Sequence, residues 1–155
     1  MSDESQALCQ ICGFCCDGTL FGDARLTDAD SAAAIAAAGV ALSGDGEKFL
    51  QPCPAYRDGK CGLYGARFQV CRVYRCRLLS DFETGELPFE AARERIATTR
   101  AAVADVRHEM RMVPGGESLC LKALYAVMRT LEAPNRTTAL LKYASLRPVL
   151  DKHFK

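Results

Sequence analysis

The stretch Cys9-Gln-Ile-Cys-Gly-Phe-Cys-Cys16 holds four of the nine cysteines in this chain of 155 residues. Four more follow before residue 77, so eight thiols fall within one half of the sequence. So many thiols in one part of a small chain need a common chemical cause, and coordination of a metal explains them best. The predicted ligands are Cys9, Cys12, Cys15, Cys16, Cys53, Cys61, Cys71 and Cys76.

A disulfide scaffold is the competing explanation, and the sequence disfavours it. An odd number of cysteines cannot all pair, and disulfide frameworks are typical of secreted chains shorter than about 100 residues. The segment Met1–Gln6 is acidic and polar, unlike a secretory signal. We therefore expect a cytoplasmic protein, in which thiols stay reduced and can bind metal.

The composition is typical of a soluble globular protein, with 49% hydrophobic and 25% charged residues. No apolar run approaches the roughly 18 residues of a membrane helix. The net charge of +1 creates no overall attraction to nucleic acid or to a membrane. We expect another protein as the partner, and no membrane.

The charges are unevenly distributed along the chain. Residues 1–30 hold six acids and one arginine, whereas residues 57–77 hold six basic residues and one acid. The basic segment has three interpretations: a solvated surface, cations that offset thiolate charge, or a nucleic-acid groove, which the scarcity of aromatic residues disfavours. Its basic residues are Arg57, Lys60, Arg67, Arg72, Arg75 and Arg77.

The first half predicts a small, irregular metal-binding domain with few or no short strands. We expect residues 1–22 to be an irregular ligand loop, and a helix to begin near Thr27, with Asp28 and Asp30 in its first turn, and to stop at Gly39. Residues 43–62 are rich in turn signals such as Arg57-Asp-Gly-Lys60.

The second half predicts three helices. Apolar or small residues alternate at intervals of three and four from Phe89 to Val113, which indicates one long amphipathic helix. A second helix is expected over about 117–131, with Cys120 on its buried face beside Leu124, Val127 and Leu131, and a third from about Thr137 to Pro148. The predicted fold is mainly α, with a cysteine-cluster domain at residues 1–82 and a helical subdomain at 83–155 packed on it.

Two kinds of metal centre fit the cysteine spacing. The C-x2-C-x2-C run at residues 9–15 resembles the run that binds a 4Fe–4S cluster, and Cys53-Pro54 would supply the remote ligand. Eight thiols could equally form two closed zinc sites of four thiolates each. The spacing favours the 4Fe–4S cluster, because residues 61–76 lack the second C-x2-C that zinc ribbons show.

Residues 9–80 resemble the CxxCxxCC cysteine-cluster family of zinc- or iron-chelating domains. The resemblance rests on the eight cysteines in order and on flanking residues between them. The matching stretches are Cys9-x2-Cys12-x2-Cys15-Cys16, Leu26-Thr27-x2-Asp30, Pro52-Cys53-x7-Cys61-x-Leu63-Tyr64-x2-Arg67 and Cys71-Arg72-x-Tyr74-x-Cys76. One departure is Phe68, where many members have proline.

The resemblance also implies an alternative function. Flagellin lysine methylases share the cysteine motif and use S-adenosylmethionine with an iron–sulfur cluster, so a protein-modifying enzyme of that kind is the second hypothesis. The chain has no convincing glycine-rich nucleotide loop. It also lacks the C-x3-C-x2-C spacing of radical S-adenosylmethionine enzymes.

Replacing a predicted ligand with serine should lower metal content and soluble yield together, because metal binding is coupled to folding when ligands converge from distant segments. We expect this for Cys12→Ser and Cys53→Ser, measured by metal analysis of the purified protein. Cys120→Ser is the control and should keep its metal. Full metal loading of the Cys12 and Cys53 variants would show that the ligand assignment is wrong.

Overall fold

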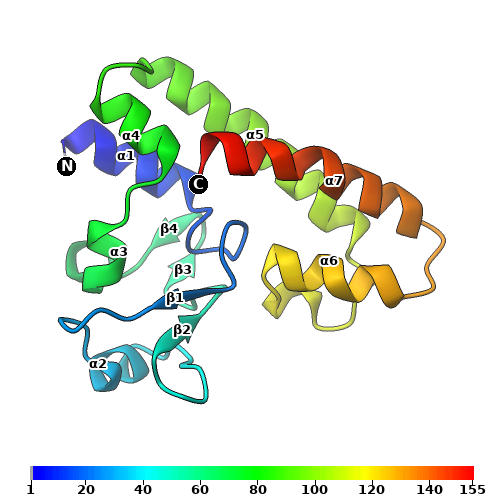
Figure 1. Ribbon diagram of the computed structural model, residues 1–155, viewed down its shortest axis with the longest axis horizontal. Helices are drawn as coiled ribbons and strands as arrows, with labels where there is room; N and C mark the ends of the chain where they lie inside the picture. The colour runs from blue at the N-terminus through cyan, green and yellow to red at the C-terminus, as the bar shows by residue number, and fades with distance from the viewer. Residues whose placement is uncertain (1) are drawn as a thin grey trace.

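The computed structural model describes residues 2–155 and is mainly helical, as the sequence predicts (Figure 1). In this part of the chain, two antiparallel sheets of two short strands each accompany the helices. The helices are α1 Asp3–Cys12, α2 Ala32–Ala37, α3 Gln69–Val73, α4 Arg77–Glu83, α5 Phe89–Glu109, α6 Leu121–Thr130 and α7 Arg136–His153, with 3-10 turns η1 Tyr64–Ala66 and η2 Gly116–Ser118. The strands are β1 Asp23–Arg25, β2 Lys48–Leu50, β3 Tyr56–Arg57 and β4 Lys60–Cys61.

The elements form a larger helical part and a smaller part that contains the strands. Helices α1, α4, α5, α6 and α7 lie together, whereas α2, α3 and the sheets lie to one side of them (Figure 1). Each part has its own group of buried apolar side chains. The smaller group consists of Ile35, Val40 and Phe49.

The prediction of an irregular loop over residues 1–22 is wrong for its first half, which forms α1. The Ser2 hydroxyl accepts a hydrogen bond from the Ser5 amide, and Asp3 and Glu4 stand in the first turn, where acids stabilise a helix. The helix buries Ser5, Leu8 and Cys12 on one face. Because this buried face contains the polar Ser5 and a predicted ligand, Cys12, the sequence does not show it as the apolar face of a helix.

The helix expected near Thr27 begins later, at Ala32, and its cap is Ser31, whose hydroxyl accepts from the Ala34 amide at 3.2 Å. The stretch before it forms a turn. In this turn the Asp30 carboxylate accepts from both the amide and the hydroxyl of Thr27. The helix ends at Ala37, close to the predicted stop.

The predicted turn at residues 57–60 joins β3 and β4 into a hairpin. Asp58 and Gly59 both have positive φ, of 51° and 74°, as the two-residue turn of a tight hairpin requires. The register pairs Tyr56 with Cys61. This hairpin therefore fixes the position of one predicted ligand.

Helix α5 confirms the spacing seen in the sequence, because Ala92, Ile96, Thr99, Val103 and Val106 are its buried residues. Helix α6 begins four residues later than expected, after the turn η2. Helix α7 continues through Pro148 to His153, although proline removes one backbone donor inside the helix. Pro148 is exposed, while Leu146 and Leu150 on either side of it are buried, so core packing carries the helix past the proline.

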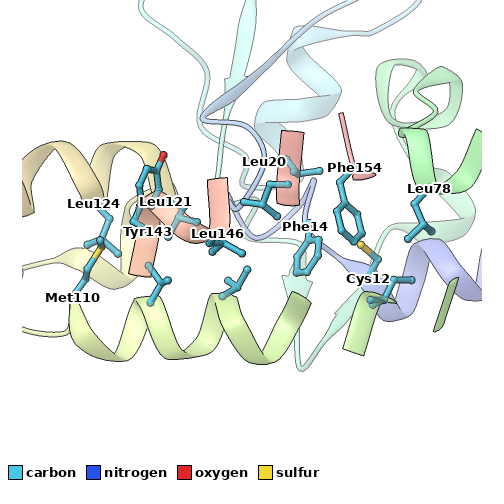
Figure 2. Close-up of a cluster of buried hydrophobic side chains, with 14 of the residues drawn as sticks. Cys12, Phe14, Leu20, Leu78, Met110, Leu121, Leu124, Tyr143, Leu146 and Phe154 are labelled. Carbon is cyan, nitrogen blue, oxygen red and sulfur yellow. The ribbon is translucent and has the colours of Figure 1, made fainter. Parts of the chain in front are cut away.

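The larger core joins the cysteine-rich half to the C-terminal helices. Figure 2 shows Cys12, Phe14 and Phe154 at one end of this core, with Met110 and Leu124 toward the other. The rings of Phe14 and Phe154 meet edge to face, with centroids 5.0 Å apart. The same apolar cluster thus includes residues from both sides of position 82, and the division into two domains there stays a prediction.

Truncating Phe154 should destabilise the whole protein. The side chain is 0% exposed, and removing a buried phenylalanine ring costs about 3–5 kcal/mol. Phe154→Ala should therefore lower the midpoint of urea unfolding strongly. Leu141→Ala is the matched control, since Leu141 is 64% exposed and its loss should change stability by less than about 0.5 kcal/mol. Equal effects of the two variants would contradict this packing.

Candidate metal centre

The eight predicted ligands are distributed over several segments of the two parts. Cys9 and Cys12 lie one turn apart on α1, and Cys15 and Cys16 lie in the turn that follows it. The remaining four come from the loop before β3, from β4, from α3 and from the residue that precedes α4. All nine cysteines are unpaired, Cys12 is buried, and the others are half-buried.

The end of α1 is built to bend the chain sharply within the cysteine run. Gly13 ends the helix in the left-handed region, at φ 69°, and its carbonyl accepts from the Cys16 amide at 2.8 Å. A side chain at this position would collide with the ring of Tyr56. The bend therefore needs glycine, and it separates the helical Cys9 and Cys12 from the two cysteines after it.

Direct hydrogen bonds tie the two distant cysteine segments together. The Cys53 amide donates to the Cys16 carbonyl at 2.8 Å. The Tyr64 hydroxyl donates to the Gln6 carbonyl on α1 at 3.3 Å. These contacts place the loop and hairpin of residues 53–64 against the segment 6–16.

The thiols at the end of α1 are electrostatic neighbours of Cys76. Burial raises the pKa of Cys12 far above its ordinary value, and the thiols of Cys76 and Cys9 add to the rise. Burial likewise raises the pKa of Cys15, and among the thiols Cys12 and Cys76 add most to the rise. A cation that replaces these protons would remove the mutual repulsion of the thiolates.

Cys16 has a different set of neighbours. Burial raises its pKa, and the thiols of Cys61 and Cys71 contribute most after burial. Burial also raises the pKa of Cys71 to about 12, together with the thiols of Cys53 and Cys61. The thiols that act most strongly on Cys15 and on Cys16 therefore differ, while Cys9 acts on both.

The thiols influence one another's pKa, but their side chains do not form a complete coordination site. Within residues 2–155, no three or more cysteine, histidine, aspartate or glutamate side chains stand in an arrangement that could hold a metal ion. The assignment of all eight cysteines as ligands stays a prediction.

One arginine of the basic segment lies directly beside a thiol. Arg67 Nη1 is 4.0 Å from Cys9 Sγ, and its guanidinium stacks over the Tyr64 ring at 3.8 Å. Burial raises the pKa of Cys9, and the positive charge of Arg67 opposes that rise. Two other arginines pair with acids instead, Arg75 with Glu83 and Arg77 with Asp81. Neutralisation of thiolate charge therefore fits Arg67 best.

Two arginines of α5 hold the cysteine segment, and the sequence analysis did not identify them. Arg100 Nη1 donates to the carbonyls of Ile11 and Cys12, at 2.9 and 3.0 Å, and to the Tyr56 hydroxyl. Arg107 Nη2 donates to the Asp17 carbonyl at 3.0 Å. A cation at the end of α1 satisfies free carbonyls and is favoured by the helix dipole. Arg100 and Arg107 are seven residues apart on one helix, and this spacing is the signal by which the sequence could have identified them.

Asp30 holds the short helix that carries Cys71. Its carboxylate accepts from the amides of Gln69 and Val70, the first two residues of α3, as well as from Thr27. Although partial burial alone would raise its pKa, these hydrogen bonds hold the pKa of Asp30 below its ordinary value. Asp30 was expected in the first turn of the helix that begins near Thr27. It instead caps α3, whose first residue, Gln69, is 39 positions later in the sequence.

Cys120 does not lie on a helix face, which corrects the prediction. It precedes α6 as its N-cap residue and is half-buried, and the buried face of that helix is made by Leu121, Leu124 and Met128. The Leu121 amide donates to the Gly18 carbonyl at 2.8 Å. The start of α6 therefore rests on the loop after the cysteine run.

Comparison with known proteins agrees with this thiol-rich arrangement. The family model named CxxCxxCC, described as "putative zinc- or iron-chelating domain", matches residues 8–102. The chain belongs to the CxxCxxCC family. No curated protein and no solved structure matches the chain. The family match covers all eight predicted ligands and extends into α5 beyond Arg100. No helix among residues 2–155 is long and apolar enough to cross a membrane.

Asp30→Asn should weaken the hold on α3, because asparagine offers one neutral acceptor where the carboxylate offers two charged oxygens. We expect a loss of about 1–2 kcal/mol at neutral pH, the usual value of a helix cap. Since the folded-state pKa of Asp30 is lowered, its contribution is complete above the unfolded pKa of about 3.9. It is lost as the pH falls through the lower folded value.

The difference in unfolding free energy between wild type and Asp30→Asn should therefore shrink as the pH falls below about 4. Urea unfolding at pH 7 and at acid pH measures it. Asp28→Asn is the control, because Asp28 is exposed. A difference that does not change with pH would contradict this role of the carboxylate.

Proposed function

We propose that this protein binds iron or zinc through its eight clustered cysteines, with a 4Fe–4S cluster as the favoured centre. The observation that carries this proposal is the meeting of residues 9–16 with residues 53–76, where the Cys53 amide donates to the Cys16 carbonyl and free thiols from both segments gather. Membership of a family described as zinc- or iron-chelating supports it.

The donor set fits both metals. Thiolate sulfur is the soft ligand that zinc and iron–sulfur clusters prefer, and all eight thiols are free. A cysteine sulfur moves with rotation about one bond, χ1. Changes of rotamer can therefore bring neighbouring sulfurs together while the hydrogen-bonded backbone stays in place.

The preference for iron–sulfur rests on the spacing of the cysteine run at residues 9–15. Zinc is the second candidate, because eight thiols suffice for two closed tetrahedral sites. A site closed by four thiolates leaves no open position for a substrate, so its role is electron transfer or stabilisation of the fold. A cytoplasmic protein with a protein partner fits such a role.

The alternative of an S-adenosylmethionine-dependent lysine methylase rests on the family resemblance alone, which is a weaker argument than a site. Calorimetric titration of the metal-loaded protein with S-adenosylmethionine tests it. Absence of binding would remove this alternative and leave metal binding untouched.

Anaerobic purification followed by metal analysis and absorption spectroscopy tests the proposed function. We expect iron with acid-labile sulfide and a broad visible absorption that bleaches on reduction. A colourless protein that contains zinc would show that the centre is zinc and not a 4Fe–4S cluster. Protein that contains neither metal, and that takes up neither after anaerobic reconstitution, would contradict metal binding itself.

A further inference from the structure

We infer that the eight cysteines form two separate four-thiolate centres that divide between the adjacent residues Cys15 and Cys16. The first centre consists of Cys9, Cys12, Cys15 and Cys76, and the second of Cys16, Cys53, Cys61 and Cys71. This inference rests on the proposed metal binding and adds to it the number of centres and the ligands of each.

The two apolar clusters of the fold support the division. Cys12 belongs to the larger core, and Cys15 and Cys76 pack against it. Cys53 and Cys71 pack against the smaller group of Ile35, Val40 and Phe49. Among residues 2–155, five of the eight thiols thus pack with one or the other core, and none of these five packs with both.

Backbone contacts place Cys16 and Cys61 with the second set. The Cys53 amide donates to the Cys16 carbonyl, and the Tyr56 amide donates to the Cys53 carbonyl at 3.0 Å. Tyr56 stands opposite Cys61 in the hairpin. These contacts connect Cys16 to Cys61 through Cys53 and Tyr56.

Cys9 joins the first set through its position on α1. It precedes Cys12 by one helical turn, and α1 packs against α4, which Cys76 precedes. Helix α1 also packs against β4, which contains Cys61, so the two centres lie side by side with Cys9 at the boundary.

This division differs from the pairing that the sequence predicts. The motif Cys53-Pro54 favours Cys53 as the remote ligand of the run at residues 9–15, whereas the structure places Cys76 beside that run. Each centre has four sulfur ligands and no open position, which suits Zn²⁺ or a 4Fe–4S cluster and not a hydrolytic metal.

Double substitutions that remove equal numbers of thiols test the division. After reconstitution with Zn²⁺ alone, the wild type should bind two equivalents. The variants Cys12→Ser/Cys76→Ser and Cys53→Ser/Cys71→Ser each remove two ligands of one centre and should retain about one equivalent. The crossed variant Cys12→Ser/Cys71→Ser damages both centres and should retain none.

A single equivalent in the wild type, or equal losses in the three variants, would overturn the division while leaving metal binding intact. A wild type that binds neither Zn²⁺ nor iron would instead contradict the proposed function. Far-ultraviolet circular dichroism of each variant verifies that the variant is folded.

A second measurement needs no substitution. Zinc-loaded wild type is treated with limiting chelator and a thiol-alkylating reagent, and mass spectrometry locates the modified cysteines. We expect the four thiols of one set to be modified together before those of the other. Modification that mixes Cys15 with Cys16 from the beginning would overturn the division.

Discussion

The gathering of eight buried or half-buried thiols in one region is the constraint on which the rest of this structure depends. Burial favours the protonated thiol, whereas a metal binds the thiolate. The contribution of the thiols to the stability of the fold therefore changes with metal binding. Contacts other than those of sulfur are needed to hold the segments together. Contacts that contain no sulfur hold them, such as the bonds of Arg100 to Ile11 and Cys12 and of Asp30 to α3. These contacts do not themselves depend on the ionisation of the thiols.

Helix α5 has a role in the cysteine-rich part that goes beyond packing. Arg100 binds the end of α1 and Arg107 binds the turn that follows the cysteine run. The family match ends at residue 102, so it includes Arg100 and not Arg107. The helices after α5 complete the larger core, where Phe154 meets Phe14.

The sequence predicted those parts of the fold that follow from local pattern. The intervals of three and four residues gave α5, and Arg57-Asp-Gly-Lys60 gave the hairpin turn. It did not predict α1, because the buried face of that helix contains the polar Ser5, and because Cys9 and Cys12 were interpreted as ligands in an irregular loop. The role of Asp30 also could not be predicted, since its partners at residues 69 and 70 come from a distant segment. The cysteines as a group were evident, whereas their neighbours depend on tertiary contacts.

The position of Arg67 follows from the charge of the cluster. Four thiolates around one zinc ion leave a net charge of −2, so two adjacent centres would repel each other, most strongly where they meet. Arg67 favours the thiolate of Cys9 and also that of Cys71, which the division assigns to different centres. Its side chain is held by stacking on Tyr64 and by a bond to the Tyr64 carbonyl. A fixed cation near two anionic sites lowers their repulsion at short range, where solvent screens little. Arg67 lies 4.0 Å from Cys9 Sγ and lowers the pKa of a thiol in each set, Cys9 and Cys71.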